Sequence, residues 1–237
     1  MKEFFLSYPR SKDFRRKASE QCKPYTDKLL TITLIYLLIS IAVAIIDSLT
    51  GSKTPIEGTD MYVTTTWFAG LFEFLTAGAF MFSFVLICKK VYDDKEPVIK
   101  DLFSGFNQFT RALVVNLLSS LYIFLWTLLF IIPGLVKSFS YALAKYIAID
   151  RPELSANECI TESRKIMDGH KWELFCLVFS YIGWMLLSAL TLGILLLWVA
   201  PKMQQAQYLF YLHVSGKGLE DEKLKEAAVE VEVVDAQ

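Results

Sequence analysis

The sequence predicts an all-α membrane protein with about six transmembrane helices in three hairpins, and with amphipathic interfacial helices on the cytoplasmic side. Of its 237 residues, 54% are apolar and 21% charged, whereas soluble domains hold about 45–50% apolar residues. The charges lie in blocks between long uncharged runs. Those runs are long enough to cross about 30 Å of hydrocarbon, which takes roughly 20 helical residues.

Residues 1–28 are predicted to form a basic, amphipathic cytoplasmic segment. Eight Lys and Arg residues precede the first apolar run, whereas a signal peptide has a short basic region followed at once by an apolar core. Phe14, Ala18 and Cys22 recur at helical spacing and form a weak apolar face. The first span then follows at residues 29–46.

The remaining spans complete a transmembrane domain at residues 29–214. Residues 61–88 form the second span, broken only by Glu73, and residues 112–136 the third. Residues 137–149 form the fourth, and residues 171–214 are long enough for two spans that turn near Gly193. Pro133 either ends the third span in a turn or kinks the fourth, and Pro201 is expected to kink the sixth.

The connections between hairpins are predicted to be amphipathic helices near residues 99–109 and 155–168. In the second of these, Ser155 and Glu158 form a capping box and Gly169 ends the helix. The acidic tail, residues 215–237, is expected to be disordered and cytoplasmic.

The distribution of Lys and Arg predicts the orientation. The N-terminal segment, the second and fourth connections and the tail hold eight, five, four and three of these residues, whereas the first connection holds only Lys53. Because positive residues are retained on the cytoplasmic side, both termini are expected to be cytoplasmic. The formal net charge of −1 gives no basic field for nucleic acid.

A candidate intramembrane polar site combines Glu73 with Lys202, Gln204, Gln205 and Gln207. Glu73 and Lys202 are both expected near mid-membrane, where a charged group needs a partner. The group is interpreted either as a structural ion pair and amide network or as a solute or proton site. Lys145 is instead expected to extend to the cytoplasmic interface.

His170, Lys171 and Trp172 are interpreted as an interfacial anchor at the start of the fifth span. With Glu173, His170 supplies at most two metal ligands, and no nucleophile motif lies nearby. The sequence therefore predicts no catalytic, cofactor or metal site, and no enzyme.

Several motifs resemble one known family. They are residues 101–106 (DLFSGF), 130–134 (FIIPG), 163–175 (SRKIMDGHKWELF), 182–184 (IGW) and 195–201 (LLLWVAP). Over residues 10–214 the chain resembles the Firmicute integral membrane proteins catalogued as domain of unknown function nine-seven-five. The resemblance implies a multi-pass protein of the bacterial plasma membrane with no established activity.

Two functions are compatible with these features. The first is a non-enzymatic accessory protein that interacts with lipid or takes part in envelope assembly, with membrane lipids and a membrane or cytoplasmic protein as candidate partners. The second is a small-solute or ion transporter or channel that uses the region of Glu73 and Lys202.

Overall fold

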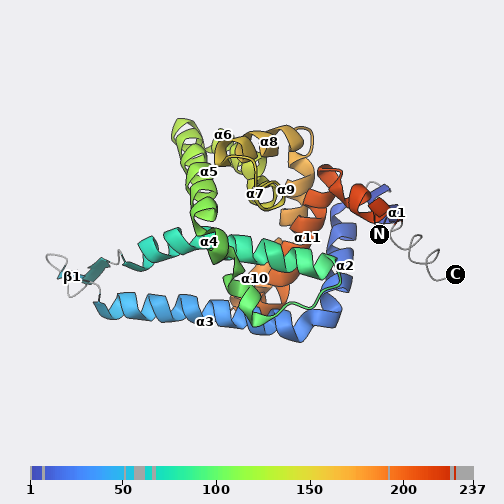
Figure 1. Cartoon of the computed structure of the whole chain (residues 1–237). Coiled ribbons are helices and arrows are strands. Elements are labelled where there is room, and N and C mark those ends of the chain that lie inside the picture. Colours follow the sequence, from blue (N-terminus) through green and yellow to red (C-terminus); the bar gives the residue numbers. More distant parts are fainter. Residues whose placement is uncertain are drawn as a thin grey trace.

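A computed structural model describes residues 2–6, 9–50, 52–55, 62–65, 68–191, 193–224 and 227. In this part of the chain the structure is helical apart from one β-hairpin (Figure 1). The N-terminal elements are α1 (Lys2–Leu6), α2 (Ser11–Cys22), η1 (Lys23–Tyr25), α3 (Thr26–Thr50), β1 (Ser52–Pro55), β2 (Tyr62–Thr65) and α4 (Phe68–Tyr92). The others are η2 (Ile99–Gln108), α5 (Phe109–Leu129), α6 (Ile131–Tyr141), α7 (Ala144–Asp150), α8 (Ala156–Ile166), α9 (Lys171–Phe179), α10 (Ile182–Leu190) and α11 (Leu196–Val214).

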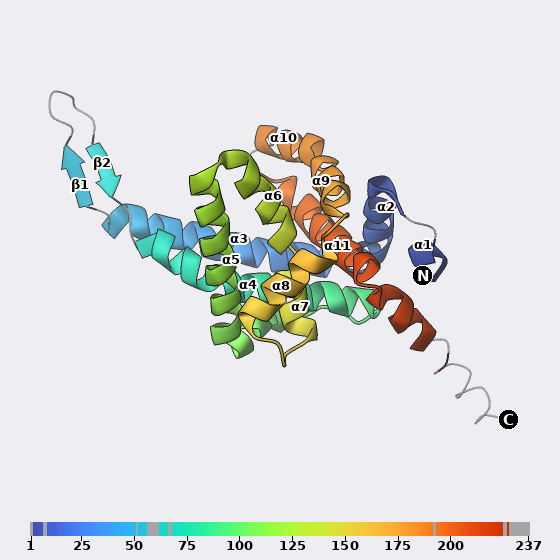
Figure 2. The same ribbon diagram turned by 90° about the horizontal axis from the view of Figure 1, so that it is seen from above.

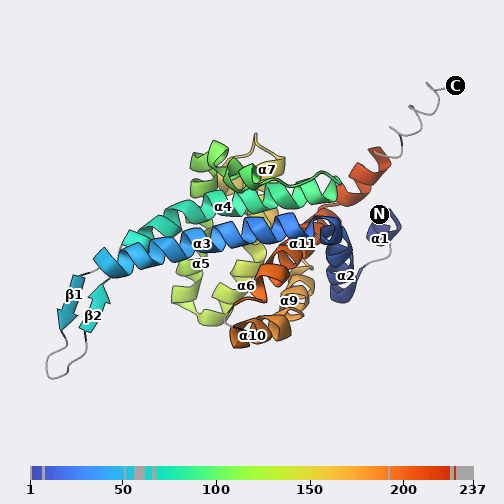
Figure 3. The same ribbon diagram turned by 90° about the horizontal axis from the view of Figure 1, so that it is seen from below.

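The first hairpin is an antiparallel pair of long helices, α3 and α4, which lie side by side (Figure 3). Each has 25 residues, or about 37 Å at 1.5 Å per residue. The Tyr36 ring packs edge-on against Phe80 and Phe84, with centroids 5.1 and 5.5 Å apart. The two strands, which the sequence reasoning did not predict, join the far ends of the pair, with Ser52 opposite Thr65 and Pro55 opposite Tyr62.

The second hairpin decides between the two predictions for Pro133. The turn lies at Phe130, whose backbone is extended, and Pro133 is the third residue of α6. A proline in the first helical turn breaks no intrahelical hydrogen bond. Pro133 therefore follows the turn and begins the fourth apolar segment, and α5 runs steeply across the α3–α4 pair (Figure 1).

Two apolar segments that were predicted as continuous helices are broken. One break separates α6 from α7 at Ala142 and Leu143, and the other separates α9 from α10 at Ser180 and Tyr181. At the first break, the buried Ser163 of α8 donates a hydrogen bond to the Ser140 carbonyl (2.8 Å) and accepts one from the Leu143 amide (3.2 Å). The freed backbone groups are thus paired, as they must be away from water.

Helix α11 lies at the centre of the fold and packs against α2, α3, α4, α9 and α10 (Figure 2). Its residues Tyr208 to Leu212 are all buried, and the Tyr211 ring stacks on Tyr146 with centroids 5.1 Å apart. The helix continues through Pro201. The packing of these apolar side chains holds α11 in the interior although the helix also carries several polar residues.

The membrane class is confirmed at the level of apolar helices. The described residues contain four helical segments long and apolar enough to cross a membrane: Ser11–Leu49, Gly70–Tyr92, Ile99–Leu129 and Lys171–Leu190. The predicted fourth and sixth spans correspond to the broken pair α6–α7 and to the polar helix α11. These two are not among the four segments.

The predicted interfacial segments pack against the protein. Ser155 and Glu158 form the predicted capping box at the start of α8, with the Ser155 amide donating to Glu158 Oε2 at 2.8 Å, and Gly169 has the positive φ that ends the segment. The face of α8 that carries Cys159, Ile160 and Ser163 is buried. Segment η2 packs on α4, where the Gly105 amide donates to Ser83 Oγ at 2.9 Å.

The start of the tail is ordered, which corrects the prediction for residues 215–237. Residues 217–224 are helical, and Lys217 Nζ lies 3.0 Å from Asp150 Oδ2. Burial alone would raise the pKa of Asp150, but Lys217, Lys89 and the Tyr211 hydroxyl hold it below its ordinary value. Residues 225–226 and 228–237 lie outside the described part.

Candidate functional site

The predicted polar site is not assembled as expected. Glu73 is exposed on the part of α4 near the β-hairpin and makes no ion pair within the described residues. Lys202 lines a pocket beside α2, Gln207 lines a separate cavity beside α5, and Gln204 and Gln205 line a third, small space. The structure therefore separates Glu73 from Lys202 and gives the glutamines different surroundings.

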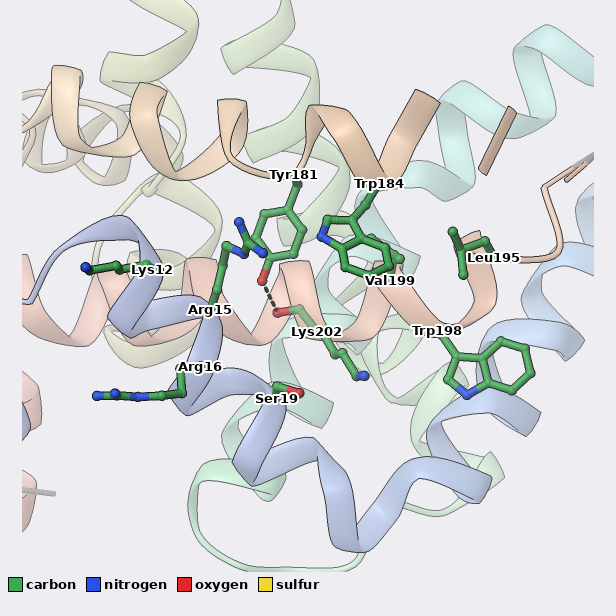
Figure 4. A pocket seen from close by; sticks show the side chains of 10 residues that line it. All are labelled: Lys12, Arg15, Arg16, Ser19, Tyr181, Trp184, Leu195, Trp198, Val199 and Lys202. Carbon is green, nitrogen blue, oxygen red and sulfur yellow. Dashed lines mark hydrogen bonds between the residues drawn. The ribbon is translucent and has the colours of Figure 1, made fainter. Parts of the chain in front are cut away.

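The pocket that contains Lys202 is called the basic pocket below (Figure 4). It has a volume of about 560 Å³ and lies between α2, the α9–α10 break and the start of α11. Its lining residues are Lys12, Arg15, Arg16, Ser19, Tyr181, Trp184, Leu195, Trp198, Val199 and Lys202. Four of them are cationic and none is acidic, so the pocket favours an anion.

Helix α2 brings three of these cations to the pocket because its opposite face is fixed to α11. Phe14, Ala18 and Cys22 are buried, and the Phe14 ring packs on Phe210 with centroids 5.7 Å apart. Gln205 Nε2 donates to Gln21 Oε1 at 2.9 Å. These contacts determine which face of α2 turns toward the pocket.

Arg15 is held at the α9–α10 break. Its Nη1 donates to the Ser180 carbonyl at 2.9 Å, and its guanidinium lies 5.3 Å from the centre of the Tyr181 ring. The Tyr181 hydroxyl in turn donates to the Lys202 carbonyl at 3.3 Å, which Figure 4 shows as a dashed line. Because guanidinium carries five N–H donors, Arg15 retains donors for a ligand.

The positive charge in the pocket is only weakly compensated. Within the described residues Lys12 and Lys202 make no ion pair, and Arg16 pairs with Asp13 at 3.5 Å while 72% of its own side chain is exposed. Arg15 and Lys202 extend into the space between α2 and α11, whereas Lys12 and Arg16 lie at the end opposite Trp198 (Figure 4). An exposed ion pair of the Arg16 type contributes little.

Two tryptophans form the other end of the pocket. The side chains of Trp184 and Trp198 are 44% and 43% exposed, and exposed apolar side chains continue from them along α10. Tryptophan favours the boundary between hydrocarbon and water because its ring is apolar and its N–H is a donor. The pocket therefore combines cations for an anionic group with aromatic rings for an apolar one.

The residues predicted to form an interfacial anchor lie apart from this pocket, at the start of α9. His170 Nδ1 lies 3.1 Å from Glu173 Oε2, and Lys171 Nζ lies 3.3 Å from Asp168 Oδ1. Trp172 is 71% exposed and stacks on Phe175 at 5.0 Å. The described residues contain no group of three or more His, Cys, Asp or Glu side chains arranged to hold a metal ion.

Sequence reasoning placed Lys202 in a site but missed its companions on α2. The available signal was the spacing of Lys12, Arg15, Arg16 and Ser19, which fall on one side of a helix whose other side carries Phe14 and Ala18. That spacing predicts which face of α2 is basic, but it does not predict which helix packs beside that face.

Comparisons with known proteins give a family match. A family model described as "Protein of unknown function (DUF975)" matches residues 8–143 and 129–218, a span that includes every element lining the basic pocket. No curated protein and no solved structure matches the chain.

Proposed function

This chain belongs to the DUF975 family of proteins of unknown function, and we propose that it is a non-enzymatic membrane protein that binds an anionic phospholipid headgroup in the basic pocket. The observation that carries this proposal is a 560 Å³ pocket lined by four cations, no acid and two half-exposed tryptophans. A phosphodiester accepts charge-assisted hydrogen bonds from Arg and Lys. The acyl chains of the same molecule would lie along the exposed apolar surface of α10.

The proposal includes a location in the bacterial plasma membrane, with six crossings and both termini in the cytoplasm. The excess of Lys and Arg in alternate connections supports the orientation. The apolar part of α6–α7 covers residues 131–149, and α11 has 19 residues, so each has about the length that one crossing needs.

Retention of lipid by the purified protein tests the headgroup site. The protein in mild detergent is mixed with phosphatidylglycerol or phosphatidylcholine, and bound lipid is counted by native mass spectrometry. We expect phosphatidylglycerol to be retained. Lys202→Gln should weaken its binding at least about tenfold, since one charge-assisted hydrogen bond contributes about 1.5 kcal/mol or more. Lys100→Gln is the matched control. Lys100 is exposed on η2 and does not line the pocket, so this substitution removes the same charge at a different place.

Two outcomes would contradict the proposal. One is equal loss of phosphatidylglycerol in the Lys202 and Lys100 variants, which would indicate a general charge effect. The other is full displacement of the lipid by millimolar inorganic phosphate, which would indicate a site for free phosphate.

A further inference from the structure

A second cavity lies on another side of α11 from the basic pocket. It has a volume of about 270 Å³ and is bordered by α4, α5, the α6–α7 break and α11. At one edge α4 and α5 are in direct contact, because a Cβ on Gly78 would lie 2.6 Å from the Ala112 carbonyl oxygen. Part of the lining is polar, and it consists of Asn116, Ser119, Ser120, Ser138, Lys145 and Gln207 together with the Tyr141 hydroxyl.

Lys145 is the one charged residue that lines this cavity in the described part of the chain. The sequence predicted that it would extend to the interface, but it lies just after the α6–α7 break, with its amine 4.9 Å from the Tyr146 ring centre. It makes no ion pair with any described residue. By contrast, Lys89 and Lys217 both pair with Asp150, so Lys145 differs in having no carboxylate.

Several other polar side chains of the cavity are donors without partners. Ser119 Oγ is buried and has no hydrogen-bond partner among the described residues. No side-chain hydrogen bond involving described residues is formed by Asn116, Ser120 or Gln207. A buried hydroxyl without a partner is costly, and two amides, two hydroxyls and an ammonium together supply many donors.

We propose that this cavity binds a small oxyanion, a phosphate or carboxylate group, with Lys145 as its counter-charge and with Ser119, Asn116 and Gln207 as hydrogen-bond donors. The cavity shares no lining residue with the basic pocket, so this inference is independent of the proposed headgroup site. Its volume accommodates the oxyanion of a small solute or the phosphate of a lipid headgroup, and the chemistry of recognition is the same.

Thermal unfolding with added anions tests the site. The full-length protein in detergent is titrated with sodium phosphate and with sodium succinate, with sodium chloride at equal ionic strength as the reference. A ligand that binds only the folded state raises the melting temperature with its concentration. We expect a saturable rise with at least one of the two oxyanions, its loss in Lys145→Gln, its retention in Lys145→Arg, and its reduction in Ser119→Ala.

Ser119→Ala also tests whether misfolding causes the loss of the anion response. Removal of an unpartnered hydroxyl should leave the melting temperature without ligand equal to that of the unchanged protein or higher. Lys202→Gln separates the two sites. If the rise is lost in Lys202→Gln and kept in Lys145→Gln, the anion occupies the basic pocket and this inference is wrong.

Native mass spectrometry distinguishes a small solute from a lipid phosphate as the source of the oxyanion. Loss of one retained phospholipid in Lys145→Gln, but not in Lys202→Gln, identifies a lipid phosphate as the ligand. If Lys145→Gln changes neither the lipid retained nor the response to phosphate or succinate, the cavity has only a structural role and the inference is overturned.

Discussion

Arg111 provides the most demanding test of how this fold is held together. From α5 its guanidinium reaches the end of α7 and the loop before α8. Nε donates to the Ala148 carbonyl at 2.9 Å, Nη1 to the Pro152 carbonyl at 2.7 Å, and Nη2 to the Arg151 and Leu154 carbonyls at 2.9 and 2.7 Å. One side chain thus pairs carbonyls at a helix end that would otherwise lack donors.

The expected effect of Arg111→Lys follows from these contacts. Hydrogen bonds to a charged group contribute about 1.5–3 kcal/mol each, but the Pro152 contact is exposed and water can replace it. Lysine keeps the charge, yet its single ammonium group cannot reproduce the planar fork. If it pairs one of the three remaining carbonyls, two bonds are lost. At the lower figure of about 1.5 kcal/mol for each bond, the free energy of unfolding should fall by about 3 kcal/mol.

Thermal unfolding in detergent micelles, followed by circular dichroism, measures this change. For a chain of this length, about 2–4 °C per kcal/mol gives a fall in melting temperature of roughly 6–12 °C. Arg164→Lys is the matched control, because Arg164 is exposed on α8 and makes no ion pair with the described residues; its effect should stay within about 0.5 kcal/mol. Equal melting temperatures for Arg111→Lys and the unchanged protein would refute this account of the α7–α8 connection.

Two further predictions concern the contacts of Asp150 and the packing of η2. Asp150→Asn should release residues 217–224 and speed their cleavage in limited proteolysis at pH 7. Because the pKa of Asp150 is lowered in the folded protein, the stability that its carboxylate adds is full above the unfolded pKa of about 3.9 and is lost as pH falls through the lower folded value. Equal cleavage of both proteins at pH 7 would contradict the contact. Gly105→Ala should lower the melting temperature strongly, since a Cβ there would collide with the Ala79 carbonyl and lie 2.8 Å from the Ser83 amide. Gly70→Ala is the control, because a Cβ on Gly70 meets no atom of the described residues within 4 Å. Similar effects of the two changes would show that η2 is not packed this closely.

Features set by neighbours along the chain were predictable. The Ser155 and Glu158 capping box and the end of the segment at Gly169 depend on residues three or so positions apart, and the structure has both. The class of apolar helices likewise follows from composition and run length. The β-hairpin was missed because its second strand, Tyr62–Thr65, belongs to the apolar run that begins at Met61. The break at Ser180 was missed because it lies inside an uncharged run, residues 174–201.

Glu73 and Lys202 form no ion pair among the described residues, and the geometry of the fold explains why residue counting could not show this. Counting residues from the ends of an apolar run gives a depth along one helix axis, and it contains no information about which helices are neighbours. Glu73 lies on the part of α4 near the β-hairpin, whereas Lys202 lies on α11 beside α2, so equal positions in two runs do not place these side chains together. Lys202 instead faces α2, which hydropathy alone assigns to the cytoplasmic surface.

The two helix breaks connect the fold with the proposed sites. A buried serine of α8 pairs the backbone at the α6–α7 break, and Arg15 of α2 pairs the Ser180 carbonyl at the α9–α10 break. Each break borders a cavity: Ala142 lines the cavity that contains Lys145, and Tyr181 lines the basic pocket. Because a helix break in an apolar environment persists only where side chains satisfy its backbone, α2 and α8 are needed to keep both cavities open. Basic and polar side chains of α2 and α8 therefore pair backbone groups in the interior of this protein.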